Sequence, residues 1–153
     1  MNANFQLLPA AVATDCLASK ELVLQRVGAL FADCYNADAS DVLDGLEERE
    51  KLGSTGFGNG VAIPHARSPL VNRPVAVLLR LESPVDFAAA DGMPVDLIFG
   101  LLSPDDAGAG HLHALAAISR LARDDNMRDA LIEAPDTEAM YALLSSRLER
   151  DAA

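Results

Sequence analysis

The stretch GSTGFGNGVAIPHAR, residues 53–67, marks the point where the chain changes from helical periodicity to strand periodicity. Its first half is a glycine-rich turn, and its second half, VAIP, leads into His65. Residues 60–63 have the pattern of a short strand, so we expect His65 at the end of that strand, where scaffolds present reactive groups. Three interpretations are open: a nucleotide loop, a metal site, or a histidine that takes up a phosphoryl group.

The glycine spacing excludes the two common nucleotide motifs. A Walker A loop needs Lys and Ser or Thr directly after its last glycine, whereas Val61 and Ala62 follow Gly60. A dinucleotide fingerprint spaces its glycines G-x-G-x-x-G between a strand and a helix, whereas Gly56, Gly58 and Gly60 follow a helix at intervals of two. Two interpretations remain: a tight turn with positive φ, or a turn whose backbone N–H groups approach an anion held by a neighbouring side chain.

Apolar spacing on either side of this stretch predicts helices at both ends of the chain and strands in the middle. The expected helices are residues 20–35, 40–52, 111–123, 126–133 and 137–147, and the expected strands are 60–63, 74–81 and 95–102. Ser19, either Asp38 or Ser40, and Asp136 are the expected N-caps. The pattern predicts one α/β domain, residues 1–153, with a small sheet covered by helices.

Composition narrows the choice of partners. Half of the 153 residues are hydrophobic, so a real core is expected, and the net charge of −11 argues against nucleic acid and anionic membranes. No apolar run is long enough to span a bilayer, and the first residues lack the basic start of a signal peptide. We therefore expect a cytoplasmic protein in which Cys16 and Cys34 are free thiols.

The two histidines of the HLH run differ in direction if they lie on a helix. Positions i and i+2 on a helix point about 200° apart. The inward stripe would comprise His111, Leu115, Ile118 and Ala122, and the outward stripe His113, Ala117, Arg120 and Asp124. We therefore expect His111 to face the core at the first turn, where the helix dipole disfavours imidazolium and favours an anion.

Arg49 is the third polar residue expected to face inward. It follows Leu46 by three residues and Val42 by seven, whereas the acidic residues of the same helix are expected on its solvated face. No carboxylate is therefore expected beside Arg49, His65 and His111. Metal sites built on two histidines usually recruit a third ligand, whereas a neutral imidazole beside a guanidinium suits phosphoryl capture better.

The motifs closely resemble those of a known family. The runs LEEREKLGSTG (residues 46–56), GNGVAIPH (residues 58–65) and HLHAL (residues 111–115) resemble the enzyme IIA domain of the mannitol/fructose class of the bacterial phosphoenolpyruvate-dependent phosphotransferase system. The resemblance covers nearly the whole chain, and the run PVDLIF (residues 94–99) looks most like the nitrogen-regulatory branch. It implies a mixed sheet sandwiched by helices. Ala66 departs from the glycine that is common after the histidine.

The resemblance also implies the roles of individual residues. His65 would accept a phosphoryl group on Nε2 from a phosphohistidine of an HPr-like carrier, and His111 and Arg49 would line the pocket. Residues Ser54, Gly58 and Gly60 would shape the turn and offer N–H groups to the phosphate. No metal or cofactor is implied.

Several functions remain open at this point. The first is a phosphocarrier that regulates a target such as a potassium transporter or a sensor kinase. The second is a sugar-uptake enzyme IIA that passes the phosphoryl group to an enzyme IIB. The others are a metal-binding module built on His65 and His111, and a protein-binding domain in which His65 is structural.

Overall fold

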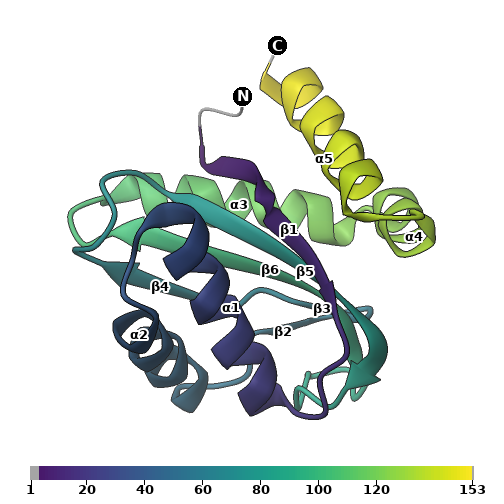
Figure 1. Ribbon diagram of the computed structural model, residues 1–153, viewed down its shortest axis with the longest axis horizontal. Coiled ribbons are helices and arrows are strands. Elements are labelled where there is room, and N and C mark those ends of the chain that lie inside the picture. The colour runs from purple at the N-terminus through teal and green to yellow at the C-terminus, as the bar shows by residue number, and fades with distance from the viewer. Residues whose placement is uncertain (1–3, 153) are drawn as a thin grey trace.

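The computed structural model describes residues 4–152 and contains one six-stranded mixed sheet with helices on both faces (Figure 1). The elements in chain order are β1 (Gln6–Asp15), α1 (Lys20–Tyr35), α2 (Ala39–Lys51), β2 (Gly56–Gly58), β3 (Val61–Ala62), β4 (His65–Ser68), β5 (Val75–Val85), β6 (Val95–Pro104), α3 (Ala109–Arg123), α4 (Asp125–Glu133) and α5 (Thr137–Ala152). The strand order is β1-β5-β6-β3-β2, and β4 also pairs with β6.

The strands β3 and β4 pair in succession with the same side of β6. Val61 lies opposite Leu97, and His65 lies opposite Leu101, both in parallel register. Pro64 lies between the two short strands, where its missing N–H costs no ladder bond, and its carbonyl accepts from the Leu101 N–H at 3.0 Å. The backbone of His65 is thereby fixed at the start of β4 by its pairing with the buried strand β6.

Each face of the sheet supports its own hydrophobic core. On β5, Val77 and Leu79 pack with α1 and α2, whereas Leu78 packs with α3, α4 and α5. This alternation is the period-2 pattern of a strand buried on both faces. Figure 1 shows α1 and α2 on one side of the sheet and α3 to α5 on the other. The expected mixed sheet between helical layers is confirmed.

The helix boundaries agree closely with those predicted from sequence. Ser19 caps α1 by accepting from the Leu22 N–H, Asp38 caps α2, and Asp136 accepts from the Ala139 N–H at the start of α5. The last helix extends beyond the predicted end at residue 147 to Ala152. The predicted caps are therefore confirmed, and Asp38 is the one of its pair that is used.

The strands were predicted less completely. The edge strand β1, which contains Pro9 and a register shift between Leu7 and Val12, was not predicted at all, and neither was β2. The expectation that His65 ends a strand of residues 60–63 is wrong, because β3 stops at Ala62 and His65 begins β4. The predicted strand therefore covers β3 alone, and β4, which begins after a break of only two residues, was not predicted either.

The glycine stretch forms the turn between β2 and β3. Gly58, Asn59 and Gly60 all have positive φ, at 112°, 57° and 82°. Gly56 serves a close approach instead, since a Cβ added there would lie 2.6 Å from the Cβ of Ala89. The expectation of a turn with positive φ is confirmed.

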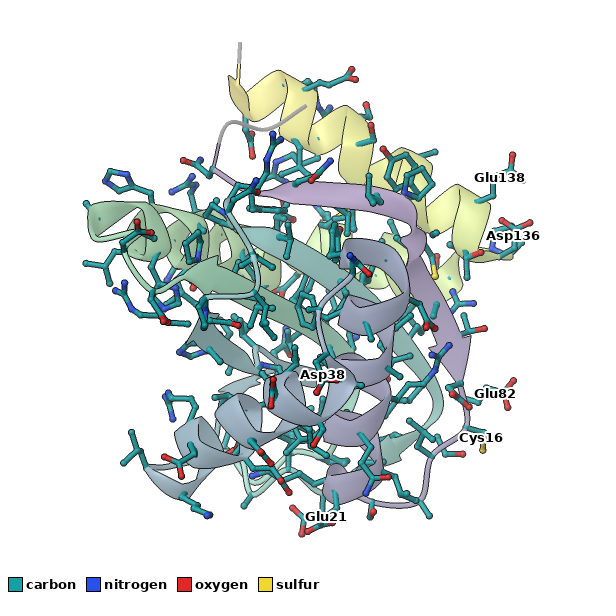
Figure 2. The ribbon with its side chains drawn as sticks, turned by 60° about the vertical axis from the view of Figure 1, so that its left-hand side comes forward. Cys16, Glu21, Asp38, Glu82, Asp136 and Glu138 are labelled. Carbon is teal, nitrogen blue, oxygen red and sulfur yellow. The ribbon has the colours of Figure 1, made fainter. Side chains whose placement is uncertain are left out.

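The surface is acidic over widely separated elements. Figure 2 labels Glu21, Asp38, Glu82, Asp136 and Glu138, which come from four different parts of the chain, and all five are exposed. The exposed Cys16 lies near the edge of the same view, and it and the half-buried Cys34 are free thiols. Among residues 4–152, no helix is long and apolar enough to cross a membrane.

Candidate functional site

His65 is half-buried, and its ring has a defined proton position. Nδ1 lies 2.7 Å from the carbonyl oxygen of Ile63. A carbonyl can only accept, so the proton is on Nδ1 and the neutral ring keeps its lone pair on Nε2. The Ile63 N–H donates in turn to the carbonyl of Thr55 at 2.9 Å, which holds this carbonyl in place. The ring is therefore oriented with Nε2 as its nucleophilic atom.

His111 lies beside His65, from the first turn of α3. The two ring centroids are 5.7 Å apart, with planes inclined by 44°. His111 is only 7% exposed, as predicted, and its Nδ1 lies 2.7 Å from the hydroxyl of Ser103. His113 is exposed, also as predicted. The first turn of α3 therefore contributes one ring to the site and leaves the other in solvent.

The buried face of α3 is rotated from the predicted stripe. Ala117, which was assigned to the outward stripe, is buried, whereas Leu115, assigned to the inward stripe, is only partly buried. The buried arc is centred on Ala114 and Leu121, so His111 lies at its edge. The assignment of Ala117 was wrong because the buried face is wider than one stripe.

Arg49 comes from the last turn of α2 and is half-buried. Its Nη1 donates to the carbonyl of Gly53 at 2.8 Å, and its charge is close enough to His65 to lower the pKa of that imidazole. The structure thus brings together the three residues predicted to face inward, from the end of α2, the start of β4 and the start of α3.

A buried carboxylate lies next to these residues, contrary to the sequence-based expectation. The side chain of Glu50 is 7% exposed, pairs with Lys20 at 2.7 Å, and accepts from both the N–H and the hydroxyl of Thr55. Glu50 follows Leu46 by four residues and Val42 by eight, so helical spacing already placed it on the inward stripe. Its negative charge raises the pKa of His65 and so opposes Arg49.

Burial keeps both imidazoles neutral near neutral pH. Desolvation is the largest cause that lowers the pKa of His65, and Arg49 adds to it. Desolvation, with Arg67 and His65, lowers the pKa of His111 to about 4. Arg67 is an exposed cation on β4 that the sequence analysis missed. The signal was its position two residues after His65, which places both side chains on one face of a strand.

Ser54 is hydrogen-bonded into the scaffold. Its hydroxyl donates to the carbonyl of Phe87 at 2.5 Å and accepts from the Gly56 N–H at 3.0 Å. These contacts join the segment after α2 to the loop that precedes β6, so they shape the entry to the turn.

The turn itself is held by charged side chains from other parts of the chain. The Asn59 N–H donates to the carboxylate of Asp91 at 2.8 Å, and the same carboxylate lies beside Gly58. Gly60 lies against the guanidinium of Arg128, which donates to the Asn59 carbonyl. The side chains that lie against Gly58 and Gly60 are therefore those of Asp91 and Arg128, and the Gly60 carbonyl accepts from the N–H groups of Asp96 and Leu97.

The two candidate metal ligands, His65 and His111, are joined by no third ligand within the described part of the chain. Among residues 4–152, no group of three or more His, Cys, Asp or Glu is placed to hold a metal ion. Both histidine Nδ1 atoms already have hydrogen-bond partners, which leaves the two Nε2 atoms.

Among residues 4–152, Nε2 of the neutral His65 has no hydrogen-bond partner, and a neutral imidazole next to a guanidinium is suited to accept a phosphoryl group. Residues 10–147 match the family described as phosphoenolpyruvate-dependent sugar phosphotransferase system, EIIA 2, and the chain belongs to that family.

Similar proteins include nitrogen regulatory proteins. The chain is 45% identical over 127 residues to one from Pseudomonas aeruginosa, with 82% of each chain covered. It is 43% identical to one from Bradyrhizobium diazoefficiens, with 83% of each covered. The crystal structure of the nitrogen regulatory protein IIA-Ntr from Neisseria meningitidis superimposes with a TM-score of 0.84 at 35% identity, covering 90% of this chain and 95% of the other.

Proposed function

We propose that the protein is a phosphocarrier and regulatory protein of the nitrogen-related phosphotransferase system, reversibly phosphorylated on Nε2 of His65. The observation that carries this proposal is the hydrogen bond from Nδ1–H of His65 to the Ile63 carbonyl at 2.7 Å. It directs the lone pair to Nε2, and burial keeps the ring neutral and nucleophilic. The nitrogen regulatory relatives support the regulatory assignment.

The proposed reaction moves one phosphoryl group between two histidines. Nε2 of His65 attacks the phosphorus of a donor phosphohistidine. The P–N bond of the donor breaks, its nitrogen takes the electron pair, and a P–N bond to His65 forms. Arg49 neutralises charge on the equatorial oxygens, and His111 lines the same pocket. Ser54, Gly58 and Gly60 act by shaping the turn. Such catalysis consists mainly of positioning and charge stabilisation.

The surroundings of the site favour a protein donor. Leu52 and Leu112, which are 84% and 63% exposed, directly follow α2 and His111. Large apolar side chains are thus exposed next in sequence to α2, which carries Arg49, and to His111, and apolar side chains form the core of protein interfaces. We therefore propose an HPr-like carrier as donor, with the reaction in the cytoplasm, and a potassium transporter or a sensor kinase as the classes of regulated target.

The test is phosphotransfer from a phosphorylated HPr-like protein, read by intact mass. The wild-type protein should gain one phosphate that is labile in acid and stable in base, and His65→Gln should gain none. His113→Gln removes an exposed histidine outside the site and should behave as wild type. Stoichiometric labelling of His65→Gln would refute the assignment of His65.

A second experiment tests the two neighbours of His65. Arg49→Gln and His111→Gln should each slow transfer or shorten the life of the phosphoprotein about tenfold or more, with unchanged circular dichroism. Arg120→Gln, which removes an exposed cation on α3, is the matched control. Wild-type rates in either test variant would remove that residue from the site.

A further inference from the structure

Ser103 is a buried polar residue next to the site, and the sequence predicted no role for it. It lies near the end of β6 and pairs in register with Arg67 on β4. Its side chain is fully buried, and its hydroxyl oxygen lies 2.7 Å from Nδ1 of His111, which is itself 7% exposed. A hydrogen bond of 2.7 Å between two buried groups fixes the orientation of the imidazole.

The direction of this hydrogen bond follows from counting donors and acceptors. A hydroxyl has one proton to donate, and a neutral imidazole has one N–H and one lone pair. If Nδ1 of His111 carried the proton, the hydroxyl proton of Ser103 would need another acceptor. Among residues 4–152, the one hydrogen bond of the Ser103 hydroxyl is that to His111. Since a buried donor without an acceptor is costly, the hydroxyl donates and Nδ1 accepts.

We infer that Ser103 is a positioning residue that fixes the proton of His111 on Nε2, so that His111 offers an N–H donor to a phosphoryl group on His65. The functional half of this inference rests on the proposed phosphorylation of His65. Ser103 itself touches neither the donor nor the phosphoryl group, and it acts through His111.

The two histidines then have opposite tautomers. The carbonyl of Ile63 can only accept, so His65 carries its proton on Nδ1 and has a lone pair on Nε2. The hydroxyl of Ser103 donates, so His111 carries its proton on Nε2. With ring centroids 5.7 Å apart, one ring is the nucleophile and the other is a donor to the same phosphoryl group. If both Nε2 atoms held lone pairs, both rings would present acceptors to the phosphate oxygens, which are themselves acceptors.

The first test reads the tautomers directly and requires no phosphorylation. In protein labelled with ¹⁵N-histidine at neutral pH, two-bond ¹H–¹⁵N correlation spectra distinguish a protonated from an unprotonated ring nitrogen. His111 should be protonated on Nε2 and bare on Nδ1, and His65 should show the reverse. The exposed His113 should show an average of the two forms. A proton on Nδ1 of His111 would overturn the inference.

The second test removes the hydroxyl. Ser103→Ala should move His111 toward the averaged pattern of His113 and shorten the life of the phosphoprotein about three- to tenfold, the effect of one neutral hydrogen bond. Ser103→Thr keeps a hydroxyl and should restore both properties. Ser68→Ala, a buried serine on β4 whose hydroxyl accepts from the Leu70 N–H, should change neither.

The outcomes separate the inference from the proposed function. A fixed Nε2 proton on His111 in Ser103→Ala would show that Ser103 does not set the tautomer, even if His65 is phosphorylated. A wild-type protein that takes up no phosphate on His65 would refute the proposed function, and the tautomers in wild-type protein and Ser103→Ala would still decide the assignment of Ser103.

Discussion

Glu50→Gln tests whether the carboxylate of Glu50 is buried and paired, as in the structure, or solvated, as the sequence predicted. The carboxylate pairs with Lys20 at 2.7 Å and accepts from the N–H and the hydroxyl of Thr55. Gln has nearly the same shape and keeps one oxygen acceptor, but it removes the charge and one acceptor atom. The change therefore tests charge rather than packing.

The expected loss of stability follows from these contacts. A hydrogen bond to a charged group contributes about 1.5–3 kcal/mol, against about 1 kcal/mol for a neutral one. Replacing the ion pair with Lys20 by a hydrogen bond from its ammonium to an uncharged amide costs about 1 kcal/mol, at the low end because Lys20 is 21% exposed and can be rehydrated. The weakened bonds to Thr55 add about 1 kcal/mol more. The total of about 2 kcal/mol corresponds to a melting temperature about 4–8 °C lower.

The assay compares Glu50→Gln with Glu48→Gln, an exposed position on the same helix whose substitution should change stability by less than about 0.5 kcal/mol. Urea denaturation measures the two losses. An NMR titration of His65 gives a second readout, because the Glu50 charge raises the pKa of that ring and its removal should lower it further. Equal stability of the two variants, with an unchanged titration of His65, would refute the buried role of Glu50.

Acidification and a turn substitution supply two further predictions. The pKa values of His65 and His111 are lowered in the folded state, so on acidification the unfolded chain binds more protons than the folded one. The free energy of unfolding is therefore unaffected by these histidines above about pH 6.5 and falls below it, for His111 down to about pH 4. The loss is up to about 1.4 kcal/mol per pH unit for each histidine. Urea denaturation across this range should show a shallower slope for His111→Gln, and an unchanged slope would contradict the prediction. Gly60→Ala and Gly92→Ala both place a side chain at positive φ, at 82° and 74°, which costs about 1–2 kcal/mol. Gly60→Ala should lose about 1 kcal/mol more, because its Cβ would lie 2.5 Å from the Arg128 guanidinium whereas nothing lies within 4 Å at Gly92; equal losses would show that Arg128 moves aside without cost.

Local signals allowed much of the fold to be predicted from the sequence. Helix caps such as Ser19 and Asp136 act through bonds within three residues, so their effect is independent of the rest of the chain. The strands β5 and β6 are buried on both faces, and their long apolar runs reflect that environment. The edge strand β1 escaped prediction because Pro9 interrupts it and because its pairing partner, β5, lies 60 or more residues further along the chain.

The site shows the same division between local and distant determinants. His111 and Arg49 could be singled out because helical spacing predicts direction from a few neighbours, and His65 because it closely follows a glycine turn and a short strand, although it begins β4 instead of ending that strand. The partner of His111 could not be predicted this way, since Ser103 reads as one polar residue ending an apolar strand. Only the packing of α3 on β6 brings its hydroxyl to the imidazole.

The pairing of Lys20 with Glu50 has a consequence for Arg49. A guanidinium beside a buried carboxylate normally pairs with it, and a phosphate oxygen would then have to displace that partner. Lys20 and Thr55 already occupy the carboxylate of Glu50, and Arg49 instead donates to the uncharged carbonyl of Gly53. Among residues 4–152, Arg49 forms no ion pair. Within the described residues the guanidinium of Arg49 is therefore available to form an ion pair with an anion at His65, while the carboxylate of Glu50 is paired with Lys20 at the start of α1.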